Sequence, residues 1–163
     1  MQKKEIKFIA GIDVSKKTFD ISVGSNEPET KVTKAHFVNN LKGYDGFTSW
    51  LKEQDIVLKN TLFCLENTGI YHRLLVQFLQ SKKASVWVET PVQIKWSLGI
   101  QRGKNDSVDS ERIMIYAFRN QDKAKIYETK HRILQQIADY LSLRSRLKDC
   151  VKALKMPVKS FCQ

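Results

Sequence analysis

The sequence contains few cysteines, and their positions exclude two classes of small protein. The chain has 163 residues with only three cysteines, Cys64, Cys150 and Cys162, which lie far apart. No two of them form a C-x-x-C pair, and none has a zinc-ligand spacing to a histidine. A disulfide-stapled secreted domain and a structural zinc module are therefore both excluded. Thiols without such a framework indicate a reducing compartment such as the cytosol.

Long apolar runs are absent as well. No segment approaches the roughly 20 consecutive apolar residues that a membrane-spanning helix requires. The opening Met-Gln-Lys-Lys-Glu-Ile-Lys leads into a short strand-like run rather than into the apolar region of a signal peptide. We therefore expect a cytoplasmic protein that makes no contact with a membrane.

Acidic residues are scarce relative to basic ones. The chain has 17 Asp and Glu against 28 Lys and Arg, which gives a formal net charge of +11. The excess grows along the chain, because residues 1–60 carry 10 basic and 8 acidic side chains, residues 61–127 carry 10 and 6, and residues 128–163 carry 8 and 3. A basic protein attracts polyanions, of which nucleic acid is the commonest. The C-terminal segment is therefore a candidate surface for nucleic acid or for a partner.

The hydrophobic pattern predicts an α/β fold with a mixed sheet. Three β-prone segments, 6–14, 19–23 and 31–38, follow one another with short polar turns, which is typical of an antiparallel meander. Two further apolar strands, 62–65 and 84–88, alternate with helical patterns. We therefore expect a layered domain over residues 1–125, with helices covering the faces of its sheet.

Helices are predicted between and after these strands. The expected helices are 41–56, a segment capped by Asn67 or Thr68, a segment 91–98, and a segment from Asn105 or Asp106 to Phe118. The three tryptophans, Trp50, Trp87 and Trp96, are expected in the core or in an interface.

A longer helical pattern occupies residues 126–163. Its apolar residues recur three, four and seven positions apart, as in a heptad seam that Arg144 interrupts and Pro157 ends. The seam consists of Ile133, Ile137, Tyr140, Leu147, Val151 and Leu154. Such a helix either packs on its own domain or forms a coiled-coil arm that joins copies of the chain, and the sequence leaves both open.

Four acidic residues stand at the ends of predicted elements. Asp13 closes the first strand, Glu66 closes the fourth, and Asp106 and Asp109 share one face at the head of a helix. Open α/β sheets gather such groups at the carboxyl ends of their strands. Clustered carboxylates repel one another, and a cation relieves that cost. Two Mg²⁺ ions about 4 Å apart, held by a few carboxylates, are suited to phosphodiester cleavage, with Mn²⁺ as a substitute.

Each acid also has an ordinary structural explanation. Asp13 suits the turn Asp-Val-Ser-Lys-Lys, and Glu66 suits the positive end of the following helix. Asp106 suits an N-cap, with Asp109 at the third helical position. Taken singly, none of the four points to chemistry more strongly than to local structure, so the surrounding motifs decide.

Those motifs resemble a known family. They are Gly11-Ile12-Asp13-Val14-Ser15-Lys16-Lys17 with Phe19-Asp20, then Glu66-Asn67-Thr68-Gly69-Ile70-Tyr71, then Lys104-Asn105-Asp106-Ser107-Val108-Asp109-Ser110. In this order and spacing they resemble the insertion-sequence-one-ten transposases, which include the pilin-gene-inverting (Piv) recombinases. The resemblance covers residues 7–155, and Ser110 stands where the family usually has Ala.

The resemblance implies both a fold and a chemistry. It implies a RuvC-like, ribonuclease-H-like domain in which Asp13, Glu66, Asp106 and Asp109 bind magnesium, followed by a coiled-coil arm. It also implies dimers or tetramers that act on DNA, in some members with an element-encoded bridge RNA, and a second domain with a nucleophilic serine. Because this chain ends at Gln163, about where that domain would begin, we expect a shortened form or a natural remnant that lacks full strand exchange.

Six further residues flank the acids in the sequence and are candidates for contact with nucleic acid. They are Lys16, Lys17, Thr68, Tyr71, Arg102 and Lys104. The cations are expected to hold phosphates, and Tyr71 to stack on a base or to hydrogen-bond a phosphate. Packing or plain solvent exposure is the alternative for each of them.

The sequence therefore predicts a metal-dependent transposase or site-specific recombinase domain. One alternative is a stand-alone Holliday-junction-type resolvase or nuclease that uses water. The other is a non-catalytic assembly module that binds nucleic acid through its basic arm at residues 128–163. Alanine at Asp106 and Asp109 separates these readings, because only the enzymes lose magnesium binding and cleavage.

Overall fold

The computed structural model divides into two units, residues 1–127 and 128–163. It describes residues 5–27, 31–67, 69–98, 106–128 and 132–161. The side chains of residues 98, 106–108, 132, 135 and 156–161 lie outside this description. The first unit is built on a five-stranded sheet, and the second contains one long helix.

Strands and helices alternate in the first unit after an opening run of three strands. The strands are β1 (Phe8–Val14), β2 (Thr18–Ser25), β3 (Thr33–Val38), β4 (Thr61–Glu66) and β5 (Ser85–Glu89). The helices are α1 (Leu41–Glu53), α2 (Arg73–Ser81), α3 (Pro91–Leu98) and α4 (Asp106–Arg119). Two short 3-10 turns, Leu58–Asn60 and Gln121–Lys123, precede β4 and follow α4.

The sheet is mixed and has the order β3-β2-β1-β4-β5. β1 pairs with β2, and β2 with β3, in antiparallel fashion, whereas β1 pairs with β4, and β4 with β5, in parallel. The predicted antiparallel meander and the predicted mixed sheet are therefore confirmed. The central strand β1 is the point where the parallel and antiparallel halves meet.

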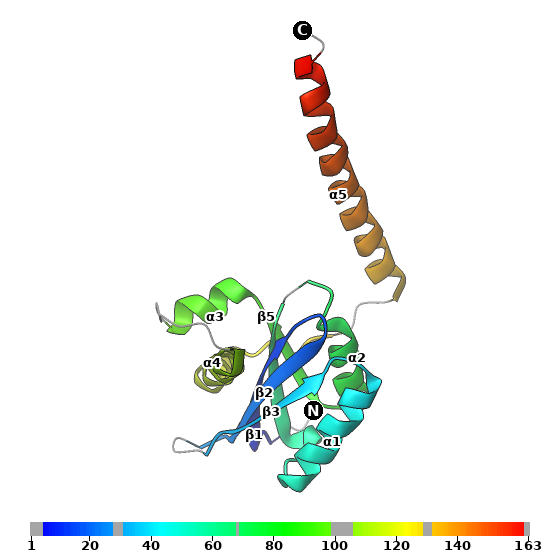
Figure 1. The fold of residues 1–163 in the computed structure, drawn as a ribbon. Coiled ribbons are helices and arrows are strands. Elements are labelled where there is room, and N and C mark those ends of the chain that lie inside the picture. The colour runs from blue at the N-terminus through cyan, green and yellow to red at the C-terminus, as the bar shows by residue number, and fades with distance from the viewer. Residues whose placement is uncertain (1–4, 28–30, 68, 99–105, 129–131, 162–163) are drawn as a thin grey trace. The chain divides into compact units, whose positions relative to one another are not determined.

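Helices cover both faces of this sheet. Figure 1 shows α1 and α2 on one side and α3 and α4 on the other. Alternate residues of β1 point to opposite faces, so Ile12 belongs to the core with α1 and α2 while Ile9 packs with Ile113 of α4. Because β1 and β4 are buried on both faces, their sequences are nearly continuous apolar runs. That burial explains why Asp13 and Glu66 stand out at their ends.

Two of the helix boundaries that were predicted in the first unit are wrong. The helix after Glu66 begins at Arg73, not at Asn67 or Thr68, because Gly69 has a φ of +76° in the left-handed region, which interrupts any helix there. Helix α1 ends at Glu53 rather than at Ile56, because Asp55 has a φ of 56°. The Ile56 backbone N–H then donates to the Leu51 carbonyl at 2.8 Å, which closes the helix end.

The second unit contains α5 (Arg132–Phe161), a helix of 30 residues. It continues past Pro157, so the predicted stop at this residue is wrong. Proline has a helical φ, and within the last turn it removes only one backbone hydrogen bond. The six residues of the predicted seam are all exposed, from 48% for Val151 to 73% for Leu154. None of the described helices combines the length and the apolar character of a membrane span.

Candidate active site

One end of the sheet carries a row of polar side chains on the face that α4 covers. Ile12 of β1 pairs with Leu65 of β4, so the next positions in the same parallel register are Asp13 and Glu66. Glu66 in turn pairs with Glu89 of β5. Neighbouring strands lie about 4.8 Å apart, so the three carboxylates occupy adjacent positions at the carboxyl ends of parallel strands.

The row continues across the antiparallel half of the sheet. Asp13 pairs with Asp20 of β2, and Asp20 pairs with His36 of β3. The His36 Nδ1 and Asp20 Oδ1 atoms are 2.9 Å apart. Since directly paired residues share one face of a sheet, all five strands contribute one polar residue to this row.

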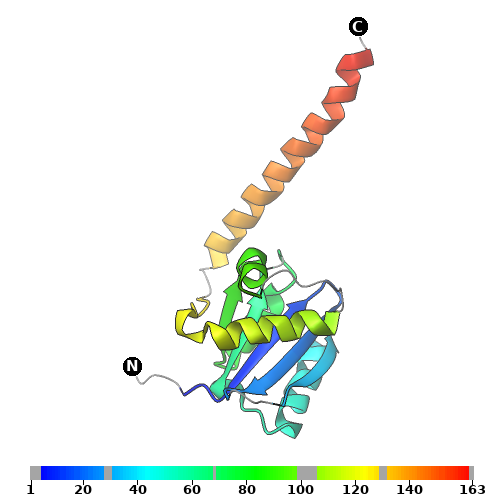
Figure 2. The ribbon, with the colours of Figure 1, turned by 90° about the vertical axis from the view of Figure 1, so that its left-hand side faces the viewer.

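Figure 2 shows that helix α4 crosses this face of the sheet, and the surroundings of Gly11 show that its backbone contacts that of β1. A Cβ atom on Gly11 would lie 2.1 Å from the Met114 nitrogen and 2.2 Å from the Ser110 carbonyl oxygen. Only a glycine allows two backbones to approach this closely. The buried hydroxyls of Ser110 and Ser22 also hydrogen-bond at 2.8 Å. The start of α4 is thereby held against β1 two residues before Asp13.

This position brings Asp109 into the field of Glu66. Burial raises the pKa of Glu66 above its ordinary value, the Lys95 charge opposes that rise, and the Asp109 charge adds to it. Asp109 is partly neutralised, because its Oδ1 accepts a hydrogen bond from Arg112 Nη1 at 2.8 Å. The Asp109 charge on α4 therefore reaches Glu66 on β4, as the smallest of the three effects on the Glu66 pKa.

Glu89 is fixed by two hydrogen bonds at the edge of the row. Tyr116 Oη of α4 donates to Glu89 Oε2 at 3.1 Å, and the Thr90 backbone N–H donates to Glu89 Oε1 at 2.7 Å. Burial and the adjacent Glu89 charge raise the pKa of Tyr116 to about 12, so this tyrosine stays a donor at neutral pH. These bonds hold the Glu89 carboxylate in place on the α4 side of the sheet.

Not every predicted site residue is described. Thr68, Arg102 and Lys104 lie outside the described residues, as does the side chain of Asp106, whose backbone begins α4. The structure puts Asp13 and Glu66 at adjacent positions at the carboxyl ends of β1 and β4, and it puts the Asp109 charge within electrostatic range of Glu66.

The predicted nucleic-acid contacts that are described lie in two loops at this same end of the sheet. Lys16 and Lys17 are exposed in the turn between β1 and β2, and Tyr71 is 41% exposed in the loop before α2. Asn39 joins the two loops, because its Nδ2 donates to the Ser15 carbonyl at 3.0 Å and to the Tyr71 carbonyl at 3.1 Å. The lysines and the tyrosine are therefore carried by segments that are tied to each other.

Sequence reasoning missed four residues of this region. Glu89 lay one position beyond the predicted strand 84–88, although an acid at a strand end was the signal used for Asp13 and Glu66. Lys95 gave no sequence signal that separates it from any other surface lysine. Asp20 and His36 alternate with apolar residues in their strands, but only the register of pairing places them beside Asp13.

The donor set fits a hard divalent cation. Carboxylate oxygens are the ligands that such ions prefer, and burial raises the pKa of Glu66, an effect that a bound cation would oppose. Among the described side chains, no group of three or more His, Cys, Asp or Glu is arranged to hold a metal ion. A cation here would therefore take Asp106 as a further ligand or draw the described carboxylates closer together.

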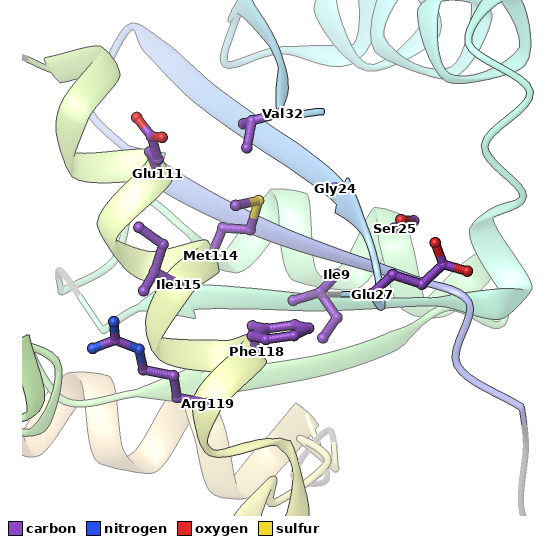
Figure 3. A pocket seen from close by; sticks show the side chains of 10 residues that line it. All are labelled: Ile9, Gly24, Ser25, Glu27, Val32, Glu111, Met114, Ile115, Phe118 and Arg119. Atoms are coloured by element: carbon purple, nitrogen blue, oxygen red, sulfur yellow. The ribbon is translucent and has the colours of Figure 1, made fainter. Parts of the chain in front are cut away.

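A cavity of about 290 Å³ lies away from this row, beside the start of β1. Figure 3 shows Met114, Ile115 and Phe118 of α4 on one side of it and Ile9 of β1 on the other. Ile9 precedes Asp13 by four strand positions, so the cavity lies toward the opposite end of the sheet. It therefore contributes nothing to the acidic row.

Comparison with known proteins gives a consistent picture. The family model for DEDD transposases of the IS110 (insertion-sequence-one-ten) type, described as Transposase, matches residues 10–161. The search of curated proteins found no match.

Two solved structures share the fold. The RuvC structure from Thermus thermophilus has a TM-score of 0.54 at 12% sequence identity, covering 74% of this chain and 99% of RuvC. The T. thermophilus RuvC in complex with a Holliday junction substrate has a TM-score of 0.53 at 13% identity, with the same two coverages. At this level of identity the likeness concerns the fold, which is ribonuclease-H-like.

Proposed function

The chain belongs to the IS110 family of DEDD transposases and carries a DNA transposase catalytic domain, and from that premise we propose how its acidic residues act. Asp13, Glu66, Asp106 and Asp109 bind two divalent cations, Mg²⁺ with Mn²⁺ as a substitute, for cleavage and transfer of DNA strands. The observation that carries the proposal is the parallel register that puts Asp13 and Glu66 at adjacent positions at the ends of β1 and β4, with the Asp109 charge of α4 acting on Glu66.

The electrostatics of the region support a cation. Burial disfavours the ionised form of Glu66 and raises its pKa, the Lys95 charge offsets part of this rise, and the Asp109 charge adds to it, so a bound cation would favour the ionised form. Bound cations would supply stabilisation of the attacking and leaving oxygens of a phosphodiester. Arg112 holds Asp109 in one orientation through the 2.8 Å ion pair, and the contact at Gly11 keeps α4 close to β1. Both contacts support a role for Asp109 beside the strand ends.

Residues around the acids would position the nucleic acid. Lys16, Lys17 and Tyr71 lie on the two loops that Asn39 joins, and we propose that they contact the DNA backbone or a base. We assign the same role to Thr68, Arg102 and Lys104 from the sequence motifs alone.

We further propose that residues 1–127 are the catalytic unit and that α5 is an arm for assembly. The exposed seam of α5, from Ile133 to Leu154, is about 32 Å long at 1.5 Å per residue, and the same seam of a second copy of the chain is suited to cover it. Dimers or tetramers formed in this way would place two acidic sites on one DNA. We also propose an element-encoded guide RNA as a partner, and this part of the proposal rests on the family alone.

Two other functions compete with this one. A stand-alone resolvase is suggested by the RuvC neighbour that is bound to a Holliday junction, and it would use the same acids with water as the attacking group. A non-catalytic module would bind nucleic acid through its basic surface and have no need of the acidic row. The convergence of carboxylates favours an enzyme over the module.

Calorimetric titration of the whole chain with MgCl₂ and MnCl₂ tests the proposal. We expect the wild type to bind both ions, and Asp109→Asn and Glu66→Gln to lose that binding while circular dichroism shows an intact fold. Asp45→Asn is the matched control, because Asp45 is exposed on α1, on the other face of the sheet. A wild type that binds neither ion, or an Asp109→Asn variant that binds them normally, would favour the non-catalytic module.

A further inference from the structure

Helix α3 presents a tryptophan to solvent. Trp96 is 82% exposed and Val92, one helical turn before it, is 54% exposed, whereas Ile94 is buried against α4. With 3.6 residues per turn, Trp96 and Val92 point about 160° to 200° away from Ile94. The sequence predicts Trp96 in the core or in an interface, and its exposure excludes the core.

The location of α3 ties this tryptophan to the acidic row. The helix begins two residues after Glu89, at the end of the sheet where the row lies, and Figure 1 shows it beside α4. Ile94 of α3 packs in the same apolar cluster as Cys64 of β4, which lies two residues before Glu66. A DNA strand whose phosphate lies at the acids would therefore run close to α3, which carries Lys95 and Trp96.

The surroundings of Trp96 suit a base better than a protein surface. Gln93, Lys95 and Ser97 on the same helix are exposed and polar, so among the described side chains of α3 the exposed apolar area lies on Trp96 and Val92. Protein interfaces bury larger contiguous patches. A flat exposed aromatic beside a cation is instead the arrangement by which proteins stack the bases of single strands while holding the backbone by charge.

We propose that Trp96 is a stacking platform for an unpaired base of the DNA strand that Lys95 guides toward the acidic row. The inference rests on the proposed function for its choice of ligand, because strand cleavage and transfer separate bases from their partners. It adds a binding residue that lies outside the three sequence motifs. Val92 extends the apolar surface beneath the stacked base.

Fluorescence anisotropy with a labelled single-stranded oligothymidine and with a blunt-ended, two-stranded duplex tests this role in the whole chain. Trp96→Ala is expected to weaken single-strand binding by about 5- to 150-fold, the range measured for loss of one stacked base. Trp96→Phe, which keeps an aromatic face, is expected to retain most of the affinity. Duplex binding is expected to be unchanged in both variants, because paired bases are not available for stacking.

Leu41→Ala is the matched control, because Leu41 is 76% exposed on α1 on the opposite face of the sheet. Manganese titration of Trp96→Ala separates the two proposals. If the wild type and this variant both fail to bind manganese, the acidic site is refuted and the stacking result still stands on its own. Single-strand affinity equal to wild type in Trp96→Ala, or an equal loss for the duplex, would overturn the stacking role.

Discussion

Substitution of Gly11 by alanine should separate α4 from the sheet. The added Cβ would lie 2.1 Å from the Met114 nitrogen and 2.2 Å from the Ser110 oxygen, whereas ordinary contacts begin at 3.4 Å. Both neighbours are backbone atoms, so no change of rotamer relieves the overlap. The helix must therefore retreat by about 1.3 Å, the difference between the required and the present separation for Met114.

The cost follows from this retreat. Overpacking in a well-packed core costs about 1–3 kcal/mol, and a clash between two backbones belongs at the upper end or beyond. We therefore expect a loss of about 3 kcal/mol in the free energy of unfolding, which lowers Tm by about 10 °C in a domain of this size. The same movement displaces Asp109 from Glu66, so affinity for Mn²⁺ should fall at temperatures where the variant is still folded.

Thermal unfolding followed by circular dichroism measures the first effect, and calorimetry with MnCl₂ measures the second. Gly46→Ala is the matched control, because its nearest neighbour is the Phe37 Cδ1 atom at 4.0 Å. Gly46 lies inside α1, where alanine should stabilise the helix by up to about 1 kcal/mol. A Gly11→Ala protein with the Tm and manganese affinity of the wild type would show that α4 is not held against β1 as described.

Three further variants have defined outcomes. Glu66→Gln should stabilise the cation-free protein at neutral pH but not at pH 3, as measured by urea denaturation. The reason is that the pKa of Glu66 is raised in the folded state, which therefore binds the Glu66 proton more tightly than the unfolded state does. The stability of the wild type accordingly falls as the pH rises through the ordinary glutamate pKa toward the raised one. Ser110→Ala should cost about 1–3 kcal/mol by removing the partner of the buried Ser22 hydroxyl, and Ser22→Ala in the same chain should recover most of the loss in thermal unfolding. Leu147→Glu in the α5 seam should reduce the mass measured by light scattering to that of a monomer. Ser145→Glu, which lies off the seam, should leave the mass unchanged. A wild type that is already monomeric would refute the coiled-coil arm.

The sequence predicted those parts of the fold that depend on local patterns. Alternation and turn residues located all five strands, and the acids at strand ends drew attention to Asp13 and Glu66 before any pairing was known. Gly11 within a buried strand is also a recognised signal of close backbone approach. Its partner could not be read, because the contact with Met114 and Ser110 depends on how α4 lies across the sheet.

The remaining features depend on tertiary arrangement. Asp20 and His36 join the row only through the register between β1, β2 and β3, and Lys95 matters only because the fold brings its charge within reach of Glu66. The late start of α2 at Arg73 reflects the left-handed backbone of Gly69, which polar capping residues upstream could not reveal. Local sequence preferences therefore determine the helices and strands, whereas tertiary packing determines which side chains meet at the acidic row.

A crystal structure of the protein soaked in manganese tests the central claim most directly, because the ion is identified by its anomalous scattering. We expect anomalous density bounded by the carboxylates of Asp13, Glu66 and Asp109, with Asp106, which is on α4 like Asp109, as a further ligand. Density elsewhere on the protein, or carboxylates that remain apart without an ion at saturating manganese, would contradict it.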